Sequence, residues 1–191
     1  MCFDGYMKSV AFILLADDPI LDFVNTLVKH SDQELDFLSD PRRIEDFFKV
    51  AFETKVAIDK KSFVQLKSFR KTLKLFFYDL IQKPKMRQSN SKSLPWFKNS
   101  RPLYLVEFTE MISQDKFSFS IQPDSNQRPL VTISRRLIDF LLVAKPSRIK
   151  KCKSKTCSHL FYDKTKANSR LWCSMKSCGN LAKIRKFRKL I

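Results

Sequence analysis

Cysteine spacing is the strongest constraint on how this chain folds. Four of its five cysteines lie near the C-terminus, as two C-x4-C pairs separated by fifteen residues. Two thiolates from one short loop and two from another can occupy the corners of a tetrahedron, the geometry of closed structural zinc sites. The spacing therefore predicts a structural Zn²⁺ site with the ligands Cys152, Cys157, Cys173 and Cys178.

Two disulfides, or four unrelated buried thiols, are the alternatives to a metal site. The early apolar run from Val10 to Ala16 is short, has no basic leader beyond Lys8 and runs into Asp17 and Asp18, so we expect no secretory signal. A reducing cytoplasm is then the expected compartment, where disulfides are rare. The Lys-rich C-terminal segment also has few large apolar residues, so we expect a bound metal to supply the stability that burial cannot.

The segment that contains the cysteines also carries most of the charge. From Pro146 to Ile191 there are fourteen Lys or Arg and one acid, Asp163, a surplus of thirteen within a net charge of +18. Such a surplus predicts a polyanionic partner. A lipid-binding helix would need a larger apolar face with Trp or several Leu, so we expect no membrane partner. Nucleic acid is the expected partner, and duplex DNA before RNA.

The end of the chain has the pattern of a basic helix. Leu181, Ile184 and Phe187 recur at helical spacing and predict one stripe that packs, while cations take the other faces. A merely solvated basic helix is the alternative. Asn180 has two open roles, bracing the turn or reading a base edge. The residues expected to contact nucleic acid are Arg170, Asn180, Lys183, Arg185, Lys186, Arg188 and Lys189.

Residues around the expected ligands have predicted supporting roles. Phe161 and Trp172 are expected to cover the metal as a small hydrophobic cap. Gly179 directly follows a predicted ligand, where the turn is expected to require a positive φ. His159 could replace a thiolate, but beside four suitable cysteines we expect it outside the ligand set.

The first 145 residues read as mainly helical. Asp18-Pro19 and Asp40-Pro41 each combine a helix N-cap with proline at the first helical position. Pro84 is expected to stop a long helix, and a polar loop is expected over residues 83–101. The expected elements are a helix from Pro19 that includes Val28, a helix from Pro41 that includes Phe52, a helix from about Lys60 to Gln82, a β-hairpin of 103–108 with 117–121, and a helix capped by Ser134 that reaches Leu142.

These elements define an α+β chain in two parts, without internal repeats or a transmembrane run. Residues 1–145 are predicted to form a mainly helical domain with a small β-hairpin near 103–121. Residues 146–191 are predicted to form a small treble-cleft-like or ribbon-like zinc finger that ends in the basic helix. The first part is large enough to bury its own core, whereas the second is not without metal.

The segment from Ile149 to Phe187 resembles the CGNR-type zinc finger. That family's pattern runs from a first cysteine pair through an F-x-D element to an R-x-W-C-S-M-x-x-C-G-N knuckle and a basic helix. Leu181 stands where the signature usually has Arg, and Leu171 where a second Arg is frequent. The matching residues here are Cys152, Cys157, Phe161, Asp163, Arg170, Trp172, Cys173, Ser174, Met175, Cys178, Gly179 and Asn180, followed by Lys183 and Arg185.

The N-terminal part carries a second resemblance. Proteins of this family usually begin with a helical, ABATE-like domain that opens with an L-D-F-x-N-T motif, and residues 21–26 read Leu-Asp-Phe-Val-Asn-Thr. The two resemblances together imply a bacterial transcription regulator. Asp22 and Asn25 are expected to brace neighbouring loops rather than bind a small molecule. A sensing role, a small-molecule effector and a dimer all stay open for residues 1–145.

An enzyme is not expected. A catalytic zinc keeps an open coordination position, and four cysteines leave none. The sequence contains no glycine-rich phosphate loop, no H-E-x-x-H and no convincing nucleophile with a base. The alternative that remains is a zinc-ribbon module that binds RNA or a protein without operator-specific regulation.

Overall fold

The computed structural model describes residues 12, 14–30, 33–82, 106–107, 120–121 and 129–188. The helices are α1 (Pro19–Asn25), α2 (Pro41–Ala51), α3 (Lys60–Gln82), α4 (Pro129–Val143) and α5 (Asn180–Arg188), with a 3-10 turn at Pro146–Arg148 and a π-helical turn at Met175–Gly179. The strands form three antiparallel hairpins, β1 (Leu27–His30) with β2 (Gln33–Asp36), β3 (Val106–Glu107) with β4 (Ser120–Ile121), and β5 (Ile149–Lys151) with β6 (Leu160–Tyr162). The predicted α+β class is confirmed.

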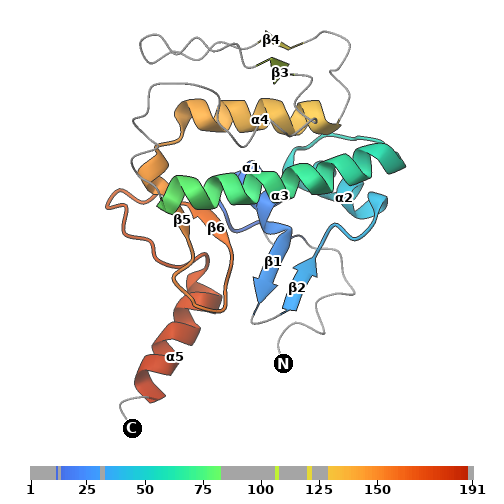
Figure 1. The fold of residues 1–191 in the computed structure, drawn as a ribbon. Coiled ribbons are helices and arrows are strands. Elements are labelled where there is room, and N and C mark those ends of the chain that lie inside the picture. The colour runs from blue at the N-terminus through green and yellow to red at the C-terminus, as the bar shows by residue number, and fades with distance from the viewer. Residues whose placement is uncertain are drawn as a thin grey trace.

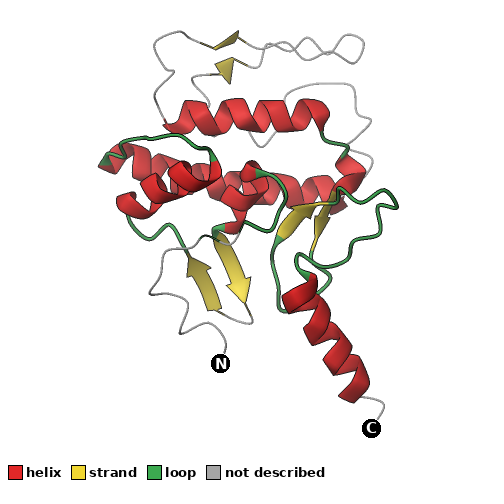
Figure 2. Ribbon diagram, turned by 180° about the vertical axis from the view of Figure 1, so that it is seen from behind, coloured by secondary structure: helices red, strands yellow, loops and turns green. Residues whose placement is uncertain are grey.

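The helices form a layered body from which the finger extends. Helices α3 and α4 lie side by side, and α1 contacts both of them as well as α2 (Figure 1). On the side of the body away from α4, the β1–β2 hairpin lies near the middle of α3, and the β5–β6 hairpin lies near one end of that helix (Figures 1 and 2). Helix α5 forms the end of the finger and points away from the body.

Phenylalanine side chains fill the core, as the helical stripes predicted. The Phe47 ring lies edge-on to Phe12 and Phe52, with centroids 5.2 Å and 5.8 Å away. The Phe140 ring of α4 lies 6.0 Å from Phe77 of α3 and 5.7 Å from Tyr162 of β6. Aromatic rings attract one another in this edge-on arrangement, so the contacts of Phe140 link α3, α4 and β6.

The hydrophobic cluster also runs across the predicted boundary at residue 145. Ile149, Leu160 and Phe161 of the finger are fully or almost fully buried, and they belong to the same cluster as the phenylalanines of the helices. The finger therefore shares its apolar packing with the body.

The first two helices begin where the sequence predicted. The Asp18 carboxylate accepts the amide of Ile20 at 2.8 Å, and that of Asp40 accepts the amide of Arg43 at 3.2 Å. These bonds satisfy amides that have no partner within a helix at its start. Helix α3 also has its predicted bounds, Lys60–Gln82.

The predicted length of the first helix was wrong. Helix α1 ends at Asn25, because the backbone N–H of Thr26 turns back to the carbonyls of Phe23 and Val24. Leu27 and Val28 then lie in β1, which pairs with β2 in a hairpin that the sequence reading did not predict. Both side chains are still buried. A short run of apolar residues is compatible with either a buried helix or a buried strand, which is why the sequence pattern did not distinguish them here.

The predicted cap of the fourth helix was also wrong. Helix α4 begins at Pro129, five residues before Ser134, and Ser134 is buried within it. Proline suits the first turn of a helix, where its missing N–H has no partner to lose. The hairpin near 103–121 is confirmed with short strands that pair Val106 with Ile121. The polar loop predicted at 83–101 lies outside the described residues.

No helix in the described part of the chain combines the length and apolar character needed to cross a bilayer.

Candidate metal centre

The four predicted ligands converge on one point. The Sγ atoms of Cys152, Cys157, Cys173 and Cys178 all lie within 4.8 Å of one another. The Sγ of Cys173 lies 3.8 Å from that of Cys157 and 3.7 Å from that of Cys178. Four sulfurs placed about 2.3 Å from a central zinc form a tetrahedron with edges of about 3.8 Å. The sulfur separations therefore match a zinc-centred tetrahedron, and they are too long for disulfides.

Short local structures bring the two pairs together. Cys152 follows β5 and Cys157 shortly precedes β6, so the first pair sits in the connection of this hairpin. The amide of Cys152 donates to the carbonyl of His159 at 2.9 Å, and that of Cys157 to Ser154 at 3.1 Å. Cys178 lies in the π-helical turn that leads directly into α5. The start of the basic helix is thus fixed by a ligand.

The surroundings of the sulfurs favour a bound cation. Mutual hydrogen bonding and burial raise the pKa of the Cys157 and Cys173 thiols, while bonds from its neighbours lower the pKa of Cys152. Without a cation, four buried thiols so close together cannot all be ionised. Binding of Zn²⁺ deprotonates all four. Backbone amides of Ser154 and Cys173 already point at the Cys152 sulfur, and such bonds stabilise metal-bound thiolates. The donor set fits zinc.

His159 lies beside the ligand group. Its Nδ1 is 3.4 Å from the Sγ of Cys157, and its backbone amide hydrogen-bonds the same sulfur. The four sulfurs complete a tetrahedron without it, as expected for a residue outside the ligand set.

Asp163 of the F-x-D element organises the loop that leads to the second cysteine pair. Its buried carboxylate accepts hydrogen bonds from Lys150 Nζ at 2.7 Å, from the Arg170 amide at 2.8 Å and from both the amide and the hydroxyl of Thr165. Burial opposes the charge, but the bonds from Lys150 and Thr165 prevail and hold the pKa of Asp163 below its usual range. Lys150 is a structural residue of the site that the sequence reading missed.

Arg170 is directed into the protein. Its guanidinium lies over the Phe161 ring, 4.4 Å from the centroid, and donates to the carbonyls of Leu15, Trp172 and Cys173. It also pairs with Asp17. These contacts take up most of its donors, so the structure does not bring Arg170 together with the cations of α5. Arg170 thus clamps the N-terminal segment to the knuckle.

The positive φ predicted at Gly179 is not observed. A Cβ at this position would lie 2.8 Å from the Met175 Sδ and 3.3 Å from Trp172 Cδ1. The Met175 side chain is flexible and 53% exposed, so it can move away from an added Cβ, and the contact with Trp172 is the tighter constraint on this position.

The L-D-F-x-N-T motif holds the finger against the body. The Asn25 amide donates to the Leu160 carbonyl at 2.8 Å and accepts the Leu160 N–H at 2.9 Å. Two residues further along the same strand, the Tyr162 amide donates to the Ala16 carbonyl at 2.8 Å. Asn25 and Ala16 therefore satisfy the outer edge of β6, which would otherwise present unpaired backbone groups.

Asp22 supports this contact from behind. Its Oδ1 accepts the amides of Leu15 at 2.9 Å and Ala16 at 3.0 Å, so it fixes the segment that meets β6 and Arg170. Burial raises the pKa of Asp22 to about 6, against the effect of these two bonds. The expectation that Asp22 and Asn25 brace neighbouring loops is confirmed.

Helix α5 exposes almost every side chain. Lys183, Arg185, Lys186 and Arg188 are exposed, and none of them has a salt bridge or side-chain hydrogen bond within the part of the chain that the structure describes. Asn180 donates to the Lys176 carbonyl at 3.2 Å, which is the bracing role. Lys189 lies outside the described residues.

The predicted packing of the α5 stripe was wrong. Leu181, Ile184 and Phe187 are 49%, 48% and 66% exposed. Their spacing is amphipathic, but the helix leaves the body and no described element covers this face (Figures 1 and 2).

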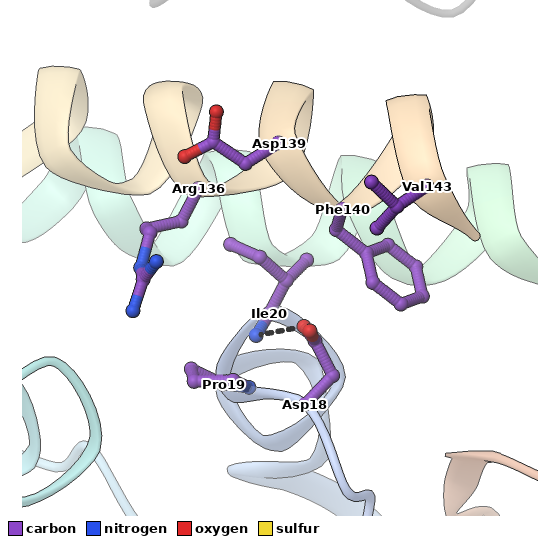
Figure 3. A pocket seen from close by; sticks show the side chains of 7 residues that line it. All are labelled: Asp18, Pro19, Ile20, Arg136, Asp139, Phe140 and Val143. Carbon is purple, nitrogen blue, oxygen red and sulfur yellow. Dashed lines mark hydrogen bonds between the residues drawn. The ribbon is translucent and has the colours of Figure 1, made fainter. Parts of the chain in front are cut away.

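A small hollow lies between the start of α1 and α4 (Figure 3). Its volume is about 200 Å³, and its lining includes Asp18, Arg136 and Phe140. Small-molecule sites usually have volumes of about 300 Å³ or more. The Asp18 carboxylate is also committed to capping α1, so we assign this hollow no ligand.

Fold and site together define a small metal-binding module of the zinc-finger class, joined to a helical body. Residues 148–189 match the family model described as CGNR zinc finger, and this range includes the four ligands and all of α5. An ABATE domain is not detected in the N-terminal part. No curated protein matches the chain.

Proposed function

We propose that this protein is a zinc-dependent DNA-binding protein, a bacterial transcription regulator of the cytoplasm, in which α5 contacts the phosphate backbone. The observation that carries the proposal is the set of four exposed cations on α5, Lys183, Arg185, Lys186 and Arg188, which lack partners among the described residues and directly follow a ligand of the metal. Exposed cations on a rigid support are what phosphate contacts need.

The metal has a structural role in this proposal. Four thiolates fill a tetrahedral coordination sphere, so zinc fixes the turn at Met175–Gly179 and thereby the direction of α5. We infer no enzymatic activity, because no coordination position is left for a substrate or an activated water. The cations then act in a fixed arrangement, with less ordering entropy lost on binding.

The N-terminal body is the second element of the proposal. We infer an ABATE-like domain from the motif at residues 21–26, and we assign Asp22 and Asn25 the task of docking the finger. A sensing or oligomerisation role of the body is compatible with this assignment. A membrane partner plays no part in it.

A salt series tests the proposal. Each neutralised phosphate contributes about −0.9 to the slope of log affinity against log salt concentration on duplex DNA. The four described cations of α5 therefore predict a slope of about −3.6, and Lys189 would make it about −4.5. Titration of labelled duplex fragments with zinc-loaded protein between low and moderate salt gives this slope.

Matched variants locate the contact. A double variant with Lys186→Ala and Arg188→Ala should flatten the slope by about 2. Lys60→Ala with Lys61→Ala removes two exposed cations at the start of α3, at the far end of that helix from α5, and should leave the slope unchanged. A slope near zero for the unmodified protein would dismiss the proposal.

Competition separates the alternative function. A module that binds RNA or a protein would prefer single-stranded RNA, or an acidic polymer such as polyglutamate, over duplex DNA. Tighter binding of RNA or of the acidic polymer than of duplex DNA, compared at equal concentration of charge, would favour the alternative function over DNA binding.

A further inference from the structure

The exposed apolar stripe of α5 has no role in phosphate binding. Successive residues of a helix are rotated by roughly 100°, so Leu181, Ile184 and Phe187 span roughly a third of the circumference. By the same count Lys183 and Arg185 lie on the two sides of this stripe, Lys186 lies opposite it, and Arg188 lies on the same face as Leu181 and Ile184. We refer to the three apolar residues as the apolar edge. About half or more of each side chain is exposed. Exposed apolar surface gains no free energy in water, whereas a partner that covered it would bind more tightly.

Charge decides which partner covers this edge. The cations beside the apolar edge have no internal partners in the described part of the chain, so a second copy of α5 would bring like charges together. The partner that fits this helix is a polyanion with a groove, where the negative charges contact the cations and apolar groups at the bottom contact the apolar edge. The major groove of DNA has this composition, because phosphates line its walls and thymine C5-methyl groups lie on its floor.

The shape of α5 agrees with the groove. A helix with its side chains is about 10–12 Å wide, and the major groove is about 12 Å wide. Helix α5 points away from the body and is exposed on nearly all faces, so the body does not block its approach (Figures 1 and 2). Asn180, whose amide could read a base, is engaged with Lys176. Apart from Arg188 at the end of the helix, apolar contact is then what this face of α5 offers to the groove floor.

We propose that the apolar edge of α5 lies in the major groove of duplex DNA and recognises thymine through its methyl groups. This inference rests on the proposed function and adds a source of sequence preference to it. A buried methyl group stabilises binding by an amount equal to about a fourfold change in affinity. Phosphate contacts alone would give no such preference.

Replacing thymine by uracil tests the inference, because it removes only the methyl group. Duplexes enriched from a random pool by zinc-loaded full-length protein are resynthesised with deoxyuridine at single thymine positions. We expect one or more positions to lose about fourfold in affinity with an unchanged salt slope. Ile184→Ala and Phe187→Ala should bind the thymine and uracil duplexes equally well. Both side chains are exposed, so these variants are expected to fold.

Two controls isolate the edge. Leu142→Ala removes a leucine of α4 that is 49% exposed, as Leu181 is, and should keep the thymine preference. Lys183→Ala removes a cation beside the edge, and it should reduce the salt slope and keep the thymine preference.

The outcomes separate this inference from the proposed function. Salt-dependent binding without any difference between thymine and uracil overturns the methyl contact and leaves the DNA-binding function standing. Loss of salt-dependent binding removes both. A wild-type dimer that Phe187→Ala converts to a monomer would assign the edge to self-association and overturn the inference.

Discussion

Removing the Asn25 amide should weaken the whole protein, although Asn25 is far from the cysteines in sequence. In Asn25→Ala the N–H and C=O of Leu160 lose their partners, and Leu160 is fully buried. A buried backbone group left without a partner costs about 1–3 kcal/mol. The two groups together predict a loss of about 3 kcal/mol in the free energy of unfolding.

Urea unfolding with excess zinc measures this loss. With a denaturant dependence of about 2–3 kcal/mol per molar urea, the midpoint should fall by at least about 1 M. Asn180→Ala is the matched control, because its amide makes one exposed bond and should change stability by less than about 0.5 kcal/mol. Release of zinc to a chromophoric chelator should be faster in Asn25→Ala than in the control. Equal stabilities of the two variants would refute the docking role of Asn25.

Three further perturbations address the other parts of the account. Burial raises the pKa of Asp22 to about 6 in the folded protein, so its folded form holds the proton more tightly than the unfolded chain and stability falls as pH rises through this range. Between pH 5 and pH 7.5, the free energy of unfolding of the unmodified protein, measured in urea, should fall by about 1 kcal/mol relative to that of Asp22→Asn. A difference between the two proteins that stays constant over this range would contradict this. Cys173→Ser should lose zinc and also lower hydrogen-exchange protection in α1, because the finger and the body share one core; full protection of α1 would argue against a shared core. Arg170→Ala should lower stability by about 2 kcal/mol with an unchanged salt slope, whereas a flatter slope at unchanged stability would restore its phosphate contact.

The sequence predicted the features that depend on short spacings. Two C-x4-C pairs identify ligands because each pair needs only one turn to converge, and the structure brings all four sulfurs together. The caps at Asp18 and Asp40 were predictable because the capping bond is local. The long helix from Lys60 to Gln82 follows from its apolar repeat and the proline that comes after it.

Features that depend on distant partners were not predictable from the sequence. Asn25 and Leu160 are separated by 135 residues, and no local pattern signals that they pair. Arg170 looks like a free cation of a basic segment until Leu15 and Phe161 are placed beside it. The apolar edge of α5 shows the same limit, because amphipathic spacing indicates a face that packs but cannot tell whether the partner lies within the chain.

The central claim is that a four-thiolate zinc centre fixes α5 for DNA binding, and metal content measured together with binding tests it most directly. Freshly purified, reduced protein should contain one zinc per chain, and a chelator should remove the zinc, the order of residues 146–188 and the salt-dependent binding together. Re-addition of zinc should restore all three. Metal-free protein that stays fully ordered over these residues and binds duplex DNA with the same salt slope would contradict the account.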